Sequence, residues 1–543
     1  MSYFIGVDVG SGSARAGVFN ESGVMLATSS YKINIYKSEE NFVEQSSENI
    51  WQSVCASVKD AISIANIDIN KISGIGFDAT CSLVVLDKNG NPLTVSSTSD
   101  HNQNIIMWMD HRAKKEADQI NCTQHEILKY VGRVISPEMQ MPKLLWLKNN
   151  RPDTWRKIGY LFDLPDFLTW KATGDDTRSL CSTVCKWNYN STYSGLGWDE
   201  DYLKLIGLDD LLEKDCKKIG QQIEKIGISI GDGLSQSAAN DLGLKIGIPV
   251  STSIIDAHAG GIGLLGIGDV QEDSFNKKIA LISGTSSCHM AVSKDPRFIN
   301  GIWGPYYDAM IPDYWLNEGG QSATGSLIDF IIQSHPSYPL LKNESDNTGK
   351  SIYQLLNESL SDLADGLENV SFLTKDINIL PYFLGNRSPR ANPYLKGVIS
   401  GTSLSSSKES LAINYLAAIQ AIAFGTKHII EEMNNAGYEI DTIVCCGGDS
   451  KNSLFIQEHS NICNCIFLLP AESESVLLGS AMLVSVASGY YKNLPEAMRK
   501  MSKVGKRIEP IVSKHQQQFY KAKYHIFHEM YNDYIKYQKM MNF

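Results

Sequence analysis

The sequence lacks the features that would place the protein on nucleic acid or in a membrane. It has no run of lysine or arginine, and its net charge at pH 7 is −11. Because a basic surface is what binds a phosphate backbone, we expect no nucleic-acid partner. No apolar stretch approaches the roughly 20 residues that a membrane-spanning helix needs. The first apolar run contains Asp8 and has no basic lead, so we expect neither a secretory signal peptide nor a membrane partner.

Disulfide pairing is also not indicated. The chain has 11 cysteines, an odd number, and most have apolar neighbours, as in Val444-Cys445-Cys446. In a chain without a secretory signal this pattern predicts reduced thiols and a cytoplasmic location. Cys181 and Cys185 are four residues apart, but no second Cys or His pair at metal spacing accompanies them, which disfavours a zinc site.

What the chain does have is the length and composition of a multidomain globular protein. With 543 residues it is too long for one hydrophobic core. Its 43% hydrophobic and 20% charged residues are ordinary values for this class. The sequence therefore predicts an α/β protein of at least two large domains.

The opening stretch, residues 4–28, predicts a three-stranded meander with a polar first turn. Apolar runs at 4–9, 14–19 and 24–28 are separated by Gly10-Ser11-Gly12-Ser13 and by Glu21-Ser22-Gly23. Glycines let backbone N–H groups approach an anion, and the hydroxyls and Arg15 add donors. Asp8, just before the turn, could face magnesium through water. A phosphate-binding hairpin and an ordinary Gly-Ser turn both remain open from this stretch alone.

Other polar residues stand where predicted strands end. Strands at 72–77 and 83–86 enclose Asp78-Ala79-Thr80-Cys81-Ser82, with a hairpin signal at Asn89-Gly90. A strand at 248–255 runs into Asp256, a typical place for a general base. Arg112 either reaches a substrate or fixes, with Asp110, the start of a helix. We expect a loop over 131–142 and a helix that starts at 144–147.

The second half of the chain opens like the first half. A predicted strand at 278–283, the turn Gly284-Thr285-Ser286-Ser287 and a returning strand at 289–292 repeat the order strand, Gly-hydroxyl turn, strand. Two such hairpins that begin two halves of a chain indicate an internal duplication. Further on, a helix at 411–433 and a strand at 442–446 precede the glycine turn at 447–448, and the last stretch of the chain reads as helices.

Together these motifs resemble one family. The ordered set DVGSGSARAGVF, DAHAGG, ISGTSS, EGGQSATG, FLGNRSP and CGGDSKN is similar to the FGGY carbohydrate kinases and extends to about residue 489. The resemblance implies two actin-like, ribonuclease H-like domains with a nucleotide cleft between them. It implies domains at 1–262, with the sugar site and the first phosphate turn, and at 263–490, with the nucleotide site. Residues 491–543 would form a C-terminal helical extension.

The resemblance also implies roles for individual residues. Asp256 would be the general base on the sugar hydroxyl, and Asp8 would organise Mg²⁺ through water. FDATCSLVV resembles the D-ribulokinase branch. The implied sugar-binding residues are Thr80, Cys81, Ser82, Lys186, Asp256 and Glu318. The implied ATP-binding residues are Ser11, Gly12, Ser13, Arg15, Gly284, Thr285, Ser286, Gly325, Asp329, Gly447, Gly448 and Asn452.

Departures from the glycerol kinases narrow the expected substrate. Gly12 replaces their hydroxyl residue, Asp329 replaces a glutamine, and Cys81-Ser82 stands where they have Arg-Glu, which disfavours glycerol. The small residues at 80–82 leave room for a five-carbon chain, so we expect ATP-dependent phosphorylation of D-ribulose. L-Ribulose, ribitol and xylulose remain alternatives, as do a non-catalytic sugar and nucleotide sensor and an actin-like ATPase. The expected partners are the sugar and ATP, and a homodimer is compatible with the family.

Overall fold

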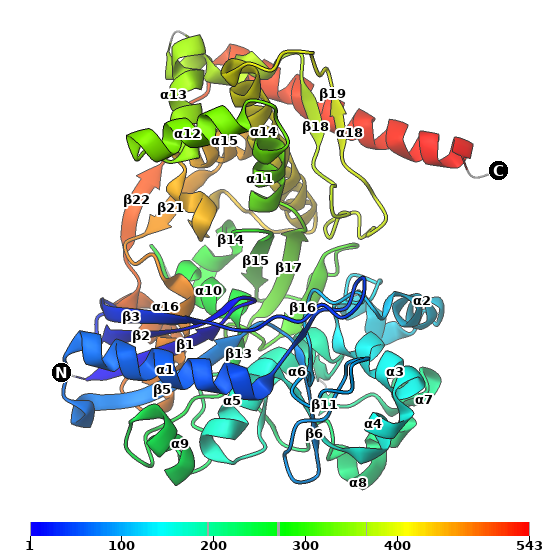
Figure 1. Cartoon of the computed structure of the whole chain (residues 1–543), viewed down its shortest axis with the longest axis vertical. Coiled ribbons are helices and arrows are strands. Elements are labelled where there is room, and N and C mark those ends of the chain that lie inside the picture. Colours follow the sequence, from blue (N-terminus) through cyan, green and yellow to red (C-terminus); the bar gives the residue numbers. More distant parts are fainter. Residues whose placement is uncertain (1, 193–194, 269–271, 365, 542–543) are drawn as a thin grey trace. The chain divides into compact units, whose positions relative to one another are not determined.

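The computed structural model describes residues 2–192, 195–268, 272–364 and 366–541. It contains two compact units (Figure 1). The first comprises 1–275, 290–317 and 470–504, and the second comprises 276–289, 318–469 and 505–543. Across the described ranges, no helix has both the length and the apolarity needed to cross a bilayer. The division at 262 and 490 drawn from the sequence stays a prediction, since it follows consecutive stretches and the compact units do not.

The first unit is built on the predicted meander. β1 (Tyr3–Val9), β2 (Ser13–Asn20) and β3 (Met25–Lys32) are antiparallel, as expected, and β1 continues the sheet in parallel with β5 (Ile72–Ala79). β13 (Ile254–Ile255) completes the order β13-β5-β1-β2-β3. Side chains of β1 point alternately to the two faces of the sheet, and both faces are buried. One face packs on α1 (Ser47–Ala65), which Figure 1 shows along these strands.

The other face of this sheet is covered by α16 (Ser475–Ala487), a helix that comes late in the chain. It approaches so closely that side chains are excluded from the strands beneath it. A Cβ on Gly6 would lie 2.0 Å from the carbonyl oxygen of Leu477, and a Cβ on Gly76 would lie 2.4 Å from that of Ser480. Glycine at these two strand positions is therefore what allows α16 to dock.

The rest of the first unit surrounds this sheet. A second sheet has the order β4-β7-β6-β8, and the smaller pairs are β10-β11 and β12-β9. The strands are β4 (Glu44–Gln45), β6 (Leu83–Asp87), β7 (Ile105–Ile106), β8 (Ile158–Asp163), β9 (Arg178–Ser179), β10 (Asn190–Thr192), β11 (Gly195–Gly197), β12 (Ile223–Glu224) and β16 (Trp303–Tyr307). The helices are α2 (Lys114–Cys122), α3 (Gln140–Asn150), α4 (Pro152–Lys157), α5 (Leu164–Thr173), α6 (Leu180–Lys186), α7 (Glu200–Leu205), α8 (Glu213–Cys216), α9 (Gln236–Leu242), α10 (Asp256–Leu265) and α17 (Leu494–Met501).

The second unit repeats the strand order of the first. The strands that belong to it wholly or in part run in the order β17-β15-β14-β20-β21-β22, and β14 pairs with β20 in parallel as β1 pairs with β5. This match supports the predicted duplication. The strands are β14 (Lys278–Ser283), β15 (Ser287–Ser293), β17 (Trp315–Gln321), β18 (Asn378–Leu380), β19 (Val398–Ser400), β20 (Thr442–Cys446), β21 (Ile466–Pro470) and β22 (Val504–Ile508). The helices are α11 (Gly325–Gln333), α12 (Tyr338–Thr348), α13 (Ile352–Ala364), α14 (Lys408–Asn435), α15 (Ser453–Cys463) and α18 (Lys514–Met541).

Three predicted elements differ from the observed ones. α3 starts at Gln140 rather than near 144, because Pro142 lies in its first turn, where a missing N–H costs nothing. The strand expected over 248–255 is shortened to β13, and Val250 makes only an isolated bridge to Ile75. β22 was missed, because its sequence VGKRI is largely exposed and has little apolar pattern.

Candidate active site

The first unit brings three carboxylates together at the ends of parallel strands. Asp8 on β1 pairs in register with Asp78 on β5, and Ile254 on β13 also pairs with Asp78. Asp256, two residues further on, opens α10. Because the carboxyl ends of parallel strands share one edge of a sheet, the three side chains meet there. The predicted general base thus lies beside the predicted magnesium residue.

Burial and the closeness of these carboxylates raise the pKa values of Asp256 and Asp78. Burial and the charge of Asp8 together raise the pKa of Asp256 to about 6, and the charge of Lys186 is among the interactions that oppose this rise. Burial, and then the charge of Asp8, also raise the pKa of Asp78 well above its usual range, although Ser480 donates a hydrogen bond to it. The site can therefore accept a proton or a cation.

Arg15 lies in an ion-pair network next to the turn at residues 10–13, which the sequence predicts to bind phosphate. Its guanidinium pairs with Asp8 and, at 2.7 Å, with Oε2 of Glu474, and these charges raise its pKa. Within the turn, Oγ of Ser11 accepts a hydrogen bond from Nε1 of Trp108 at 2.9 Å. A Cβ on Gly12 would meet nothing within 4 Å, so the turn is open at its tip. The open tip leaves room for an anion, and binding of phosphate by this turn stays a prediction.

The residues predicted to bind the sugar form a compact group. The hydroxyls of Thr80 and Ser82 lie 3.3 Å apart, and the backbone N–H of Trp108 donates to Oγ of Ser82 at 3.2 Å. Lys186 is 4% exposed, with its Nζ 4.4 Å from the centre of the Trp303 ring. The lysine charge opposes the rise in the pKa of Cys81, which burial brings to about 12.

Since Lys186 acts on both Cys81 and Asp256, it lies near both, and the structure unites five of the six predicted sugar residues. The sixth, Glu318, is buried on β17 in the second unit.

The second phosphate turn, in the second unit, is tied to the start of α11. The backbone N–H groups of Thr324 and Gly325 donate to the carbonyls of Thr285, at 3.1 Å, and Gly284, at 2.8 Å. Within the turn, the N–H of Gly284 donates to the carbonyl of Ser286 at 3.0 Å. A Cβ on Gly325 would lie 2.7 Å from the oxygen of Gly284, whereas a Cβ on Gly284 would meet nothing within 4 Å. Glycine at 325 is thus required by close packing, and the turn stays open.

The loop after β20 joins the same cluster. Oγ of Ser283 donates to Oδ2 of Asp449 at 2.7 Å. Gly447 has φ +98°, and a Cβ there would lie 2.1 Å from the carbonyl oxygen of Ser283, so only glycine fits. Burial and the charge of Asp329 raise the pKa of Asp449. The predicted nucleotide residues of the second unit, Gly448 included, therefore lie around two turns in contact with each other.

Asn452 has a structural role that its sequence context only partly indicates. It is the N-cap of α15, where its Oδ1 accepts from the N–H of Leu454 at 3.2 Å and from Nδ2 of Asn357 at 3.1 Å. Its Nδ2 donates to the hydroxyl of Tyr415 at 2.6 Å. These bonds fix the loop, and the expected contact of Asn452 with a nucleotide stays a prediction.

The surroundings of Asp8 fit a hydrated magnesium ion. Oδ1 of Asp78 is buried without a hydrogen-bond partner, next to Asp8 in the sheet. Arg15 donates hydrogen bonds to Oδ2 of Asp8. Among the described residues, no group of three His, Cys, Asp or Glu side chains is arranged to hold a metal ion directly. Magnesium prefers carboxylate oxygens and keeps several waters, so these residues suit a water-mediated site.

Several residues of the site were not identified from the sequence. No individual role was predicted for Asp78, although a carboxylate at the end of a buried strand is the same signal that singles out Asp256. The bond of Trp108 to Ser11 has no local sequence signal. Glu474 and Ser480 reach Arg15 and Asp78 from α16, 459 and 402 positions away along the chain. No local pattern reports contacts of such separation.

Arg112 does not reach out toward a ligand. Its side chain is fully buried between the rings of Phe42, 4.0 Å away, and Trp146, 4.8 Å away. Its Nη2 lies 2.7 Å from oxygens of both Glu44 and Asp110. Of the two alternatives that the sequence left open, the structure favours the structural one.

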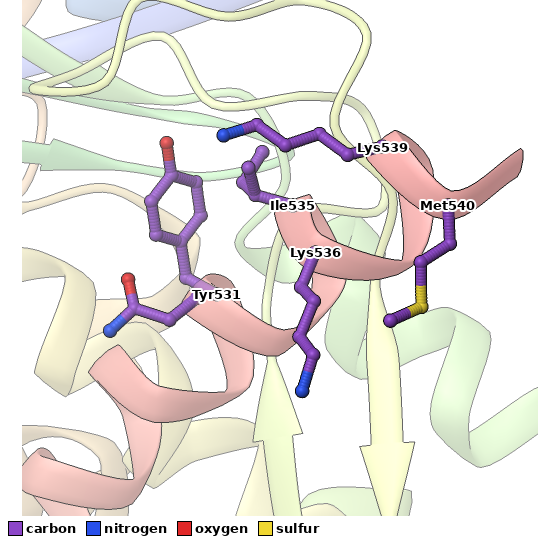
Figure 2. A pocket seen from close by; sticks show the side chains of 6 residues that line it. Tyr531, Ile535, Lys536, Lys539 and Met540 are labelled. Carbon is purple, nitrogen blue, oxygen red and sulfur yellow. The ribbon is translucent and has the colours of Figure 1, made fainter. Parts of the chain in front are cut away.

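A pocket on the second unit lies apart from these residues. Its volume is about 480 Å³. Figure 2 shows that the side chains lining it all project from α18; they are Tyr531, Asn532, Ile535, Lys536, Lys539 and Met540. None of the predicted sugar or nucleotide residues is among them, so this pocket is not part of the candidate active site.

Known proteins are similar to this chain in sequence and in fold. Residues 3–263 match the N-terminal domain of the FGGY family of carbohydrate kinases, and residues 279–488 match its C-terminal domain. The FGGY carbohydrate kinase domain-containing protein of Homo sapiens is 49% identical over 548 residues, which cover 99% of this chain and 98% of that protein. A D-ribulokinase of Saccharomyces cerevisiae is 38% identical over 513 residues, 90% of this chain and 72% of the yeast protein.

Among solved structures, the xylulose kinase of Rhodospirillum rubrum has a TM-score of 0.80 at 18% identity, over 98% of this chain and 99% of that one. This similarity confirms the two-domain, actin-like fold that the sequence predicted. With both family domains matched in order along the chain, the protein belongs to the FGGY family of carbohydrate kinases and is an enzyme that phosphorylates sugars.

Proposed function

We propose that the protein transfers the terminal phosphoryl group of ATP to D-ribulose, with D-ribulose 5-phosphate as the product. The observation that carries this proposal is the environment of Asp256. Its carboxylate has a pKa of about 6 and lies near Lys186 and the small residues at 80–82. A base with a pKa close to the working pH, next to a cation that can bind sugar hydroxyls, suits deprotonation of an alcohol.

In this mechanism the side chains of the first unit hold and activate the sugar. Lys186, Thr80 and Ser82 supply hydrogen bonds to its hydroxyls. Asp256 accepts the proton of the primary hydroxyl while that oxygen attacks the γ-phosphorus and the bond to the ADP oxygen breaks. A positioned base of this kind contributes on the order of 10²–10⁴-fold to the rate.

The other requirement of phosphoryl transfer is neutralisation of the phosphate charge. Arg15, Ser11 and Ser13 would donate to the phosphates from the first turn, and the turn at 284–286 would hold the nucleotide in the second unit. Asp8 and Asp78 would hold a hydrated magnesium ion, which supplies positive charge to the phosphates when bound.

Two observations support D-ribulose as the substrate: the small side chains at residues 80–82 and the names of two relatives. The side chains at 80–82 are small, and a 38% identical relative is named a D-ribulokinase. A second relative, 29% identical over 94% of this chain, is named ribulokinase 2. L-Ribulose, xylulose and ribitol are the competing substrates, because they differ from D-ribulose only in hydroxyl stereochemistry or oxidation state.

The test is a coupled assay of ADP release with D-ribulose, L-ribulose, D-xylulose, ribitol and glycerol at fixed MgATP. We expect the highest kcat/KM for D-ribulose and near-complete loss of turnover in Asp256→Asn. Asp201→Asn, which changes an exposed carboxylate of the same unit, is the matched control and should retain activity. A higher kcat/KM for another sugar would overturn the substrate assignment. ADP release without sugar would indicate an ATPase, and no release at all a sensor.

A further inference from the structure

One buried carboxylate close to the sugar residues has no role in this mechanism. Asp163, the last residue of β8, is 0% exposed. Its Oδ2 accepts two hydrogen bonds, from Nε1 of Trp187 and from Nε2 of Gln140, both at 2.9 Å. Oδ1 of Asp163 is buried without a hydrogen-bond partner. Two neutral N–H donors therefore converge on one oxygen.

Each donor belongs to a different side of the sugar-binding group. Trp187 directly follows Lys186 and ends α6. Gln140 also donates, through the same Nε2, to the backbone carbonyl of Cys81 at 3.2 Å. One carboxylate oxygen thus connects the end of α6, which carries the lysine, with the loop that carries Cys81.

The partners of Asp163 are almost inaccessible to water, which makes its bonds hard to replace. Trp187 is 2% exposed and Gln140 is 0% exposed. Without an acceptor at this point, two buried N–H groups would be left unpaired, and a displacement of the indole or the amide would follow. Such a displacement would move Lys186 or the backbone of Cys81.

The charge on Asp163 is not needed for these bonds. Burial and the charge of Asp166 raise its pKa to about 7, and Lys143 opposes that rise. Both the protonated and the ionised carboxyl group can accept from two N–H donors, as can the amide oxygen of asparagine. The conservative variant therefore separates the position of the acceptor from its charge.

We propose that Asp163 is a positioning residue that sets the distance between Lys186 and the loop of Cys81, and through it the affinity for the sugar. The inference deepens the proposed function and rests on it. It concerns the sugar alone, since neither donor contacts the residues predicted to bind the nucleotide.

The experiment compares Asp163→Ala with Asp163→Asn. We expect the alanine variant, which leaves two buried N–H groups without their acceptor, to raise KM for D-ribulose about tenfold or more, with KM for ATP changed less than about twofold. The asparagine variant should restore most of the sugar affinity. Asp210→Ala is the matched control, because Asp210 also accepts from an indole, Nε1 of Trp155 at 2.6 Å, and should change neither KM.

A second variant guards against loss of folding. Trp187→Phe keeps a buried aromatic ring and removes the five-membered ring of the indole with its N–H, so it should also raise KM for the sugar and not for ATP. Equal changes in KM for the sugar and KM for ATP would overturn the proposal. A wild-type KM for the sugar in both Asp163→Ala and Trp187→Phe would also overturn it.

Calorimetric binding of D-ribulose without ATP keeps the two proposals distinguishable. If the wild type binds the sugar but releases no ADP, the proposed function fails, and the Kd values of the variants still test Asp163. If the wild type turns over and Asp163→Ala shows an unchanged Kd, only the positioning role fails. No binding and no turnover would overturn both.

Discussion

Lowering the pH should inactivate Asp256 well above the pH at which an ordinary aspartate becomes protonated. The general base must be ionised to accept the proton of the sugar hydroxyl. Burial and the charge of Asp8 raise its pKa from 3.8 to about 6. With that value the ionised fraction falls about tenfold between about pH 7 and about pH 5, whereas an unperturbed aspartate would lose less than about 10%. We therefore expect kcat/KM for the ketopentose to fall about tenfold over this range.

Lys186 provides the internal control for this pH profile. Its charge lowers the pKa of Asp256, so Lys186→Ala should move the acidic limb to higher pH. A titration that belongs to the nucleotide would not move with this variant. The assay is ADP release at saturating MgATP and limiting ketopentose, at constant ionic strength. A limb that lies below about pH 5, or that is identical in both proteins, would refute the assignment of Asp256 as the base.

Three further measurements test neighbouring parts of the argument. Lys186→Ala should raise KM for the ketopentose far more than KM for ATP, because the lysine lies with the sugar residues; equal increases would make it structural. Gly325→Ala should raise KM for ATP and leave Kd for the sugar unchanged, since its Cβ would lie 2.7 Å from the oxygen of Gly284; an unchanged KM for ATP would contradict the nucleotide role of this turn. The pKa of Asp163 is raised from 3.8 in the unfolded chain to about 7 in the folded protein, so protonation of this carboxyl group stabilises the folded state. That stabilisation is complete below about pH 3.8 and is lost as the pH rises to about 7. Denaturant unfolding should therefore show the wild type losing about 3 kcal/mol relative to Asp163→Asn between about pH 4 and about pH 7; a difference independent of pH would refute the raised pKa.

The strands that frame the site could be predicted because their local sequence is unambiguous. β1, β14 and β20 are short apolar runs that a glycine directly follows, β2 is an apolar run that the turn Glu21-Ser22-Gly23 closes, and each was found within two residues of its observed bounds. The bounds of β13 could not be predicted, because the apolar run that precedes it pairs with β5 only through the isolated bridge between Val250 and Ile75.

The positions of candidate site residues were predictable where one residue stands at a strand end, as Asp8 and Asp256 do, and the chemical roles of both stay predictions. Contacts between distant segments were not predictable. The bond from Trp108 to Ser11 spans 97 positions, and the two bonds of Asp163 join β8 to separate helices. In each case the functional arrangement depends on packing that no local pattern reports.

The docking of α16 on the first sheet has a consequence for biosynthesis. This helix closes the face of β1 and β5, yet it is translated only after the whole stretch 318–469. A nascent chain therefore cannot complete its first hydrophobic core until residues 475–487 have been translated, and this face of β1 and β5 stays uncovered meanwhile. Co-expression of fragments 1–469 and 470–543 should rescue solubility that the first fragment lacks when it is made alone.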